Sequence, residues 1–108
     1  MTQEDFNKLV KQLNEYSYDI MMSKGPEYRS DNDDILNNFK QTAKNLDISE
    51  LKVWGTFMDK HLQSIFSHVK NANLKKSETI HSRFADIINY CYLGYALFIE
   101  RDGKKKNN

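Results

Sequence analysis

The sequence predicts an all-α protein that folds as a compact, oligomeric four-helix bundle. Apolar residues recur at helical spacing in four segments of the 108-residue chain. One proline and four glycines leave little room for the many tight turns of an all-β fold. In addition, residues 87–99 are apolar or aromatic almost all the way round a helix, which is typical of a helix surrounded by other protein. We therefore expect a single helical domain over residues 1–101, followed by a flexible basic tail over residues 102–108.

The first predicted helix begins after Thr2, whose side chain can cap it, with Glu4 and Asp5 favourably placed in its first turn. Gly25 followed by Pro26 is expected to end this helix. We interpret it as a core-forming amphipathic helix without chemistry of its own. Its apolar residues at helical spacing are Phe6, Leu9, Val10, Leu13, Tyr16 and Ile20.

The next segment, residues 24–34, is rich in turn formers and is predicted to be a loop with functional potential. Lys24 and Arg29 can hold a phosphate, and Tyr28 can stack on a base. The run of Asp and Asn at residues 31–34 looks superficially like a metal cluster. However, aspartates are also expected at a helix start for capping and dipole reasons, and the calcium-loop pattern is not matched.

Two further helices are predicted over residues 33–45 and 50–70, with Ser49 as the cap of the second one. Asn38 lies on the flank of the first of these two helices. Lys60 and His61 lie on the flank of the other, where they could together hold an anion. The simpler interpretation of His61 is a hydrogen-bonded histidine at the edge of the bundle.

The last predicted helix runs from Ile80 to Arg101, with Ser77 as its cap and Gly103 just beyond its end. It is too short to span a bilayer, which takes about 20 apolar residues. We therefore expect it to be the central helix of the bundle and part of a subunit contact. Its thiol, Cys91, is expected to be inert packing.

Asp86 and Asn89 interrupt this apolar helix and are expected to share a face with Ser82. Burying an unpaired carboxylate is costly, so Asp86 needs a cation, a metal or several hydrogen-bond donors nearby. One interpretation is structural, with Asp86 bonded to an Arg, Lys or His of a neighbouring helix. The other is a binding site, because Asp and Asn can together accept from and donate to a polar ligand.

The charge of the chain indicates which partners to expect, and its cysteine content indicates the cellular compartment. The formal net charge is +1, with 16 Lys and Arg against 15 Asp and Glu, so we expect neither DNA nor a membrane as a partner. A single cysteine excludes an intramolecular disulfide and fits a reducing cytoplasm. Residues 1–5 are polar and acidic, unlike a signal peptide, so a cytoplasmic location is predicted.

Four short motifs follow one another along the chain: Lys24-Gly25-x-Glu27-Tyr28, Asp34-x-Leu36-x-Asn38-Phe39-Lys40, Lys60-His61-x-x-Ser64-Ile65 and Arg83-x-x-Asp86-x-Ile88-Asn89-Tyr90. Their order resembles that of a group of small, phage-encoded helical proteins, over about residues 20–99. The last helix is also similar to the final metal-binding helix of the all-α nucleoside triphosphate pyrophosphohydrolases, the MazG-like and dimeric dUTPase-like enzymes.

Those enzymes hold magnesium with a carboxylate quartet from an E-x-x-E turn and an E-x-x-D turn. This sequence keeps Asp86, but Arg83 stands three residues before it and Ser82 four residues before it, and no predicted helix offers E-x-x-E. Magnesium requires hard oxygen ligands, so the replacement of a carboxylate by a cation favours an anion site over a metal site. We therefore expect neither a metal nor another cofactor.

The resemblance also implies a counter-defence role. Phages encode small helical sponges that sequester cyclic oligonucleotides or cyclic ADP-ribose without cleaving them, as homo-oligomers with pockets between subunits, in the host cytoplasm. On this hypothesis basic residues hold phosphate, aromatic residues such as Trp54 stack a base, and Asn and Asp residues recognise its edge. The predicted nucleotide-binding set, which includes no catalytic residue, is Lys24, Tyr28, Arg29, Asn38, Lys60, His61, Arg83, Asp86, Asn89 and Tyr90.

Two alternatives remain open at this point. One is a divergent, magnesium-dependent MazG-like pyrophosphohydrolase that uses Asp86 with loop acids such as Glu27 and Asp34. The other is a protein-interaction module whose exposed aromatic side chains bind a host protein.

Overall fold

The computed structural model describes residues 1–29, 32–71, 73 and 79–106, with side chains up to Lys104. Four helices make up the fold: α1 (Gln3–Arg29), α2 (Asn37–Leu46), α3 (Glu50–Lys70) and α4 (Ile80–Lys106). All regular structure within the described residues is helical, which confirms the predicted all-α class.

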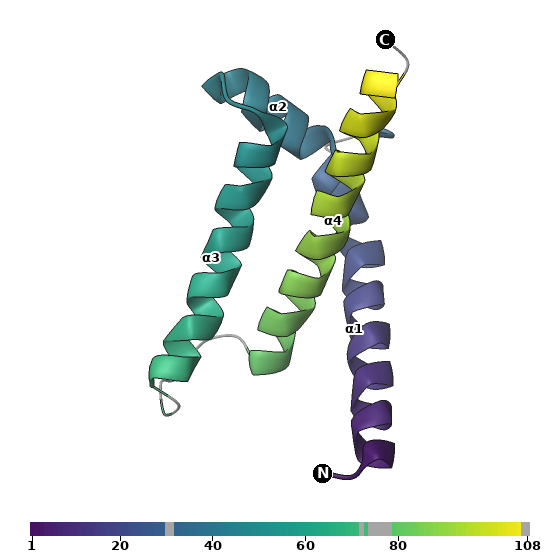
Figure 1. The fold of residues 1–108 in the computed structure, drawn as a ribbon, viewed down its shortest axis with the longest axis vertical. Helices are drawn as coiled ribbons and strands as arrows, with labels where there is room; N and C mark the ends of the chain where they lie inside the picture. Colours follow the sequence, from purple (N-terminus) through teal and green to yellow (C-terminus); the bar gives the residue numbers. More distant parts are fainter. Residues whose placement is uncertain (30–31, 72, 74–78, 107–108) are drawn as a thin grey trace.

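The helices form an open layer rather than a closed bundle (Figure 1). α4 lies between α1 and α3 and packs against both, while α2 crosses one end and packs on α1 and α3. The Cα radius of gyration is 16.3 Å, and the molecule measures 50 × 29 × 26 Å. A compact domain of this length has a radius of gyration of about 13 Å. The arrangement is thus more extended than the compact bundle that the sequence predicts.

The main hydrophobic core lies at the end where α2 crosses the other helices. Partly buried aromatic side chains from three helices, Tyr28, Trp54 and Tyr90, pack around this core. The opposite ends of α1, α3 and α4 are held by fewer buried side chains, among them Ile65 and Ala85. Side chains are therefore most completely buried near α2, and fewer are buried toward the start of α4. The residues of the main core are Leu36, Phe39, Ala43, Val53, Leu93 and Leu97.

α1 begins as predicted, because the Thr2 hydroxyl accepts a hydrogen bond from the Asp5 amide at 3.1 Å. The prediction that Gly25 and Pro26 end the helix is wrong, since α1 continues through Pro26 to Arg29. Proline removes one intrahelical hydrogen bond.

Two side chains of α2 donate to backbone carbonyls in the last turn of α1, beyond the proline. The Asn38 amide donates to the Glu27 carbonyl at 2.5 Å, and the Asn37 amide donates to the Arg29 carbonyl at 3.0 Å. The last carbonyls of a helix have no partner within the helix, and here a neighbouring helix supplies the donors.

α2 begins at Asn37, four residues later than predicted, because the preceding polar side chains build turns instead. The Asn32 side-chain oxygen accepts from the Asp34 amide, and the Asp34 carboxylate accepts from the Leu36 amide. Such local bonds offer the backbone an alternative to the helix. Asn32 and Asp34 therefore stabilise the turns that connect α1 to α2.

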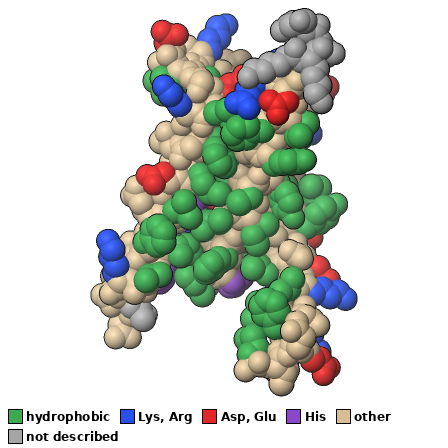
Figure 2. Space-filling model, in the orientation of Figure 1, with side chains coloured by type: hydrophobic (Ala, Val, Ile, Leu, Met, Phe, Trp, Pro, Cys, Tyr) green, Lys and Arg blue, Asp and Glu red, His purple; other side chains and the backbone are tan. Residues whose placement is uncertain are grey.

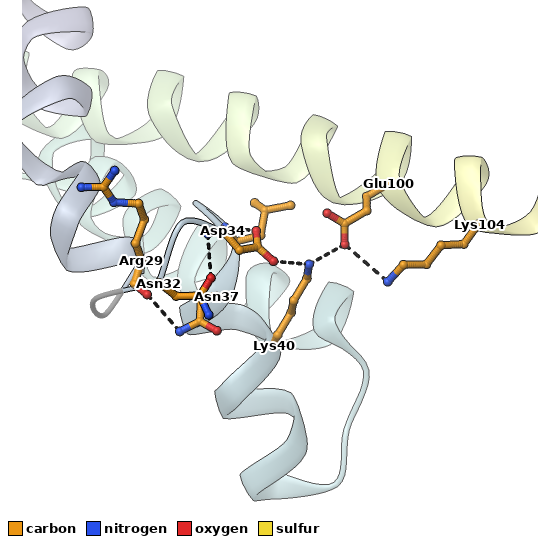
Figure 3. A network of polar contacts seen from close by, with 8 residues as sticks. Arg29, Asn32, Asp34, Asn37, Lys40, Glu100 and Lys104 are labelled. Atoms are coloured by element: carbon orange, nitrogen blue, oxygen red, sulfur yellow. Dashed lines mark hydrogen bonds and ion pairs between the residues drawn. The ribbon is translucent and has the colours of Figure 1, made fainter.

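Lys40 ties this turn to the far end of α4 (Figure 3). Its ammonium group contacts the Asp34 carboxylate and lies 2.6 Å from the Glu100 carboxylate, which is 3.5 Å from Lys104. Burial lowers the pKa of Lys40, but the hydrogen bonds to Asp34 and Glu100 outweigh burial and raise it. The same bond from Lys40 lowers the pKa of Asp34. One cation thus joins three segments of the chain.

α3 has the predicted bounds, and the Ser49 hydroxyl caps it by accepting from the Lys52 amide at 3.1 Å. α4 begins at Ile80 as predicted, although the expected cap, Ser77, lies outside the described residues.

The prediction that α4 ends before Gly103 is wrong, because the helix continues to Lys106. Lys104 pairs with Glu100 one turn earlier, and positive charge is favourable at the carboxyl end of a helix. The expected flexible tail is therefore helical over residues 102–106, and residues 107–108 lie outside the described part.

A glycine sets the contact between α3 and α4. A Cβ atom added to Gly94 would lie 2.3 Å from Cε2 of the Trp54 indole, so only glycine leaves room for this ring. The indole N–H then donates to the Tyr90 carbonyl of α4 at 2.7 Å. Trp54 thereby fixes the position of α3 along α4.

Candidate functional site

Four of the predicted binding residues come together from three helices, and we call them the acid–aromatic cluster: Tyr28 of α1, His61 of α3, and Asp86 and Tyr90 of α4. His61 Nδ1 lies 3.8 Å from Asp86 Oδ2. The His61 ring lies 4.6 Å from the Tyr90 ring, and the Tyr28 and Tyr90 rings meet edge to face at 6.4 Å, measured between centroids. The cluster borders the main core and is half-buried.

The two phenols of the cluster are held in their neutral form. Burial raises the pKa of Tyr28 to about 12, and the nearby Tyr90, Asp86 and Glu27 add to this effect. Burial also raises the pKa of Tyr90, again with a contribution from Asp86. Both hydroxyls therefore remain hydrogen-bond donors at neutral pH. The His61 and Asp86 side chains attract each other as an ion pair only when the imidazole is protonated.

Asn89 does not share its surroundings with Asp86, although the sequence predicts a common face. Asn89 is buried, and its amide donates to the Ser17 carbonyl of α1 at 2.9 Å. Asp86 instead faces α3. Residues three apart are offset by about 60° around a helix, which is enough to direct them to different neighbours. Asn89 therefore joins α4 to α1 and lies outside the acid–aromatic cluster.

The remaining predicted residues are distributed over the molecule. Lys24 on α1 and Lys60 on α3 are exposed, and Arg83 on α4 is half-buried. Arg29 lines a small cavity of about 170 Å³ with Pro26, Asn32 and Asp33, while the Asn38 amide caps the end of α1. The predicted nucleotide-binding set is thus divided between the cluster, the corner of α1 and α2, the buried contact of Asn89 with α1, and the partly or fully exposed surface, and it stays a prediction.

The metal quartet implied by the resemblance has no counterpart in the described residues, where no three His, Cys, Asp or Glu side chains are grouped to hold a metal ion. Asp34, one of the acids considered for that role, is engaged by Lys40. The pyrophosphohydrolase alternative gains no support from the structure and stays a prediction.

None of the helices in the described part of the chain has both the length and the apolar character to cross a membrane.

One surface was missed by the sequence analysis, namely the side of α4 that points away from α1 and α3. The prediction that other protein surrounds this helix holds for Ala85, Leu93 and Leu97, which are buried, but not for the opposite side. Cys91 is exposed there, so its assignment as interior packing is wrong. We call this side the outer face of α4, and it comprises Phe84, Ile88, Cys91, Tyr95 and Phe98.

Hydrophobic side chains also gather over α3 and α4 in the space-filling view, while most of the charged side chains lie toward the ends of the molecule (Figure 2). The outer face of α4 continues into an apolar groove of about 520 Å³ beside α1. Phe84 belongs to both, and the groove also contains the Tyr16 and His81 rings, whose centroids lie 4.5 Å apart. The groove is lined by Leu9, Gln12, Leu13, Tyr16, Ile80, His81 and Phe84.

A simple geometric consideration predicts this exposure. Residues 87–99 of α4 are apolar almost all the way round, but only two long helices flank α4, and α2 has only ten residues. Two neighbours on one side of a helix leave the opposite side uncovered, and this is where the outer face of α4 lies.

Comparisons of the chain with protein-family models, with curated proteins and with solved structures give no match, so the assignment of function depends on the geometry described above.

Proposed function

We propose that this protein is a helical protein–protein association module whose contact surface is the outer face of α4. The observation that carries the proposal is the row of exposed aromatic side chains on this face, with the half-buried Ile88 among them. Tyr95 is 68% exposed, and Phe84 and Phe98 are 44% and 40% exposed. Contiguous apolar patches on a folded protein mark interaction sites, and interface centres are enriched in aromatic residues and depleted of charge.

Photo-crosslinking in the cells that produce the protein tests this proposal. A benzophenone side chain at position 95 replaces an exposed tyrosine on the proposed surface, and the same group at Lys44 on α2 is the matched control. We expect a discrete crosslinked protein band from position 95 and none from position 44. The absence of a discrete band from position 95, with the protein folded, would contradict the proposal.

A second candidate function is supported by the acid–aromatic cluster. Three helices bring a carboxylate, an imidazole and two neutral phenols together beside the core, and such groups can hold a base and its polar edge. We propose on this basis the phage-type counter-defence role, in which a homo-oligomer in the host cytoplasm sequesters a cyclic oligonucleotide or cyclic ADP-ribose without cleaving it.

Calorimetry against cyclic dinucleotides, cyclic trinucleotides and cyclic ADP-ribose isomers tests this second candidate. We expect one member of the panel to bind at micromolar concentrations or below, and we expect His61→Ala to weaken its binding by about tenfold or more. Asn45→Ala, an exposed change on α2, is the matched control and should bind as the wild type does. If no member of the panel binds the wild type, this function is excluded for these ligands.

A further inference from the structure

We propose that the last turn of α1, residues 26–29, is a hinged lid over the acid–aromatic cluster. The lid pivots at Gly25 and must open before a flat aromatic ring can bind against Tyr90. This inference rests on the second candidate function, in which the cluster binds a nucleotide, and it specifies how access to that site is controlled. It follows from how the lid is attached to α1, to α2 and to the cluster.

The lid reaches the cluster through Tyr28. This side chain packs against the main core, and its ring meets the Tyr90 ring edge to face at 6.4 Å. Pro26 and Glu27, in contrast, are exposed to solvent, and Arg29 is half-buried. Tyr28 therefore occupies the space beside Tyr90 that another flat ring could take once the lid is open.

The hinge lies at a weak point of the helical backbone. Pro26 has no N–H to donate to the Met22 carbonyl, so one intrahelical hydrogen bond is missing where the lid begins. Gly25 precedes the proline, and glycine gains more conformational freedom than any other residue when a helical segment opens. Opening of residues 26–29 therefore breaks fewer hydrogen bonds, and releases more chain entropy, than opening of a regular helical turn.

Free space adjoins the lid. Two surface cavities, of about 170 Å³ and 290 Å³, are both lined by Pro26 and Arg29. The buried residue of α1, Ser17, lies well before the lid. Segments with few packed contacts open locally at a lower free energy than the core does. The lid is therefore the part of α1 that we expect to open while the rest of the fold stays intact.

Two asparagines of α2 hold the lid closed. The Asn38 amide donates to the Glu27 carbonyl at 2.5 Å, and the Asn37 amide donates to the Arg29 carbonyl at 3.0 Å (Figure 3). The bond from Asn38 is exposed, so water can replace it when the lid opens. The closed position thus depends on bonds from α2 and on the contact of Tyr28 with the core and Tyr90.

Opening leaves the place of the Tyr28 ring vacant, while the other members of the cluster stay on α3 and α4. The Tyr90 ring can then pack against an aromatic base. Asp86 and His61, whose side chains lie 3.8 Å apart, can accept from and donate to the polar edge of that base. When only the open form binds, the apparent affinity is proportional to the open fraction. A change in the open fraction must therefore alter lid opening and ligand affinity by the same factor.

Native-state amide hydrogen exchange tests the hinge. Gly25→Ala should slow exchange at residues 27–29 together by about fivefold, because alanine favours the helix. The added Cβ atom is tolerated, since its nearest neighbour is Ile35 Cδ1 at 3.8 Å. Gly55→Ala is the matched control in α3, where a Cβ atom has no neighbour within 4 Å among the described residues, and it should leave these amides unchanged. Unequal rates at residues 27–29 that do not respond to Gly25→Ala would indicate ordinary fraying of a helix end and would overturn the proposal.

Asn38→Asp tests the attachment to α2. The substitution keeps the shape of the side chain but replaces the donating nitrogen by an oxygen, so exchange at residues 27–29 should be about fivefold faster or more. Asn45→Asp, an exposed change on the same helix, is the matched control. The amide of Leu97, which is buried in the core, reports global unfolding. An equal increase at Leu97 would mean that Asn38 stabilises the whole fold rather than the lid, and would count against the proposal.

Calorimetry with adenosine tests whether the lid controls access to the cluster. Adenosine is the probe because it presents a flat base without the charge of a phosphate. Gly25→Ala should bind it about fivefold more weakly than the wild type, and Asn38→Asp about fivefold more tightly, in proportion to the exchange rates. Equal affinities in the three proteins, or no binding to the wild type, would overturn the lid as the entrance to the cluster.

The outcomes separate the lid from the function that it serves. If no cyclic nucleotide of the panel binds, but the affinity for adenosine follows the open fraction, the sequestering function fails and the lid stands. If a cyclic nucleotide binds the wild type and Gly25→Ala equally well, the function stands and the lid is overturned.

Discussion

At the scale of single residues, Gly94 is the position where side-chain size decides how α3 packs on α4. We predict that Gly94→Ala lowers the free energy of unfolding by about 1–3 kcal/mol, because the added methyl group displaces the Trp54 indole. The displacement also breaks the bond from the indole to the Tyr90 carbonyl. Urea denaturation followed by tryptophan fluorescence measures both the stability and the change in the indole environment.

Gly55→Ala is the matched control for this prediction. Gly55 also lies inside a helix, but a Cβ atom there would have no neighbour within 4 Å among the described residues. Alanine favours the helix over glycine by about 1 kcal/mol, so this variant should be more stable than the wild type. Equal effects of the two substitutions would show that helix propensity, and not the contact with Trp54, controls position 94.

Because of Tyr28, the acid–aromatic cluster is expected to make stability depend on pH in the alkaline range. Burial raises its pKa from 10.0 to about 12 in the folded protein. A group whose pKa is raised on folding contributes stability that is complete below its unfolded pKa and is lost as the pH rises through the folded pKa. We therefore predict that the wild type loses stability between about pH 10 and pH 12, and that Tyr28→Phe loses about 1–2 kcal/mol less over this range.

Urea denaturation at several alkaline pH values measures this difference, and absorbance at the phenolate band reports the ionisation directly. Tyr18→Phe is the control, since Tyr18 is exposed on the same helix. If Tyr28→Phe and the wild type lose stability in parallel over this pH range, the phenol of Tyr28 is not held neutral by its surroundings.

At the scale of the helices, Lys40 connects the turn before α2 with the end of α4. We predict that Lys40→Gln lowers the free energy of unfolding by about 0.5–1 kcal/mol at neutral pH, as expected for a partly exposed ion-pair network. The pKa of Asp34 is lowered in the folded protein, so its contribution is present above its ordinary value of 3.8 and is lost as the pH falls through the folded value.

The difference between Lys40→Gln and the wild type should therefore shrink as the pH falls below 3.8. Denaturation curves across the acidic range measure it. Lys44→Gln changes an exposed lysine of the same helix and should alter stability by less than about 0.5 kcal/mol. A difference that stays constant into strong acid would mean that Lys40 acts without Asp34.

The helix boundaries show what local sequence determines and what it does not. Ser49 and Thr2 cap their helices as predicted, because a cap depends on side chains within three residues of each other. The end of α1 was mispredicted at Pro26, since the last turn beyond the proline has its carbonyls bonded by asparagines of α2. The usual tendency of a helix to end at Gly-Pro follows from local sequence, whereas the stabilisation of the turn beyond it comes from side chains of another helix.

In the candidate site, too, some features follow from local sequence and others depend on how the helices pack. The sequence indicates that Asp86 needs a partner and that His61 borders an apolar face, and the structure brings these two side chains to 3.8 Å. It does not indicate that Asn89, three residues from Asp86, is directed to α1 instead. Periodicity places residues on a face of one helix, but the neighbours of that face depend on how the other helices pack.

At the scale of the whole molecule, the apolar surface that the sequence assigns to a central helix exceeds what one chain covers. The periodicity of residues 87–99 predicts burial all round, and the fold supplies it on one side only, through Leu93 and Leu97. Apolar side chains with this pattern can be buried either by other helices of the same chain or by another chain. Sequence alone therefore could not distinguish a compact bundle from an open layer that is completed by association.

Because association stabilises only the folded state, the proposed homo-oligomer makes thermal stability depend on protein concentration. For a dimer, the smallest such oligomer, we predict that the Tm of the wild type rises by about 3 °C for each tenfold increase in concentration, since a dimer gains about 1.4 kcal/mol for each such step. Tyr95→Glu should have a lower Tm that does not change with concentration, whereas Tyr18→Glu should follow the wild type. Calorimetric scans over two decades of concentration measure these slopes. A wild-type Tm that is independent of concentration would mean that the exposed outer face of α4 contributes nothing to folding stability through self-association.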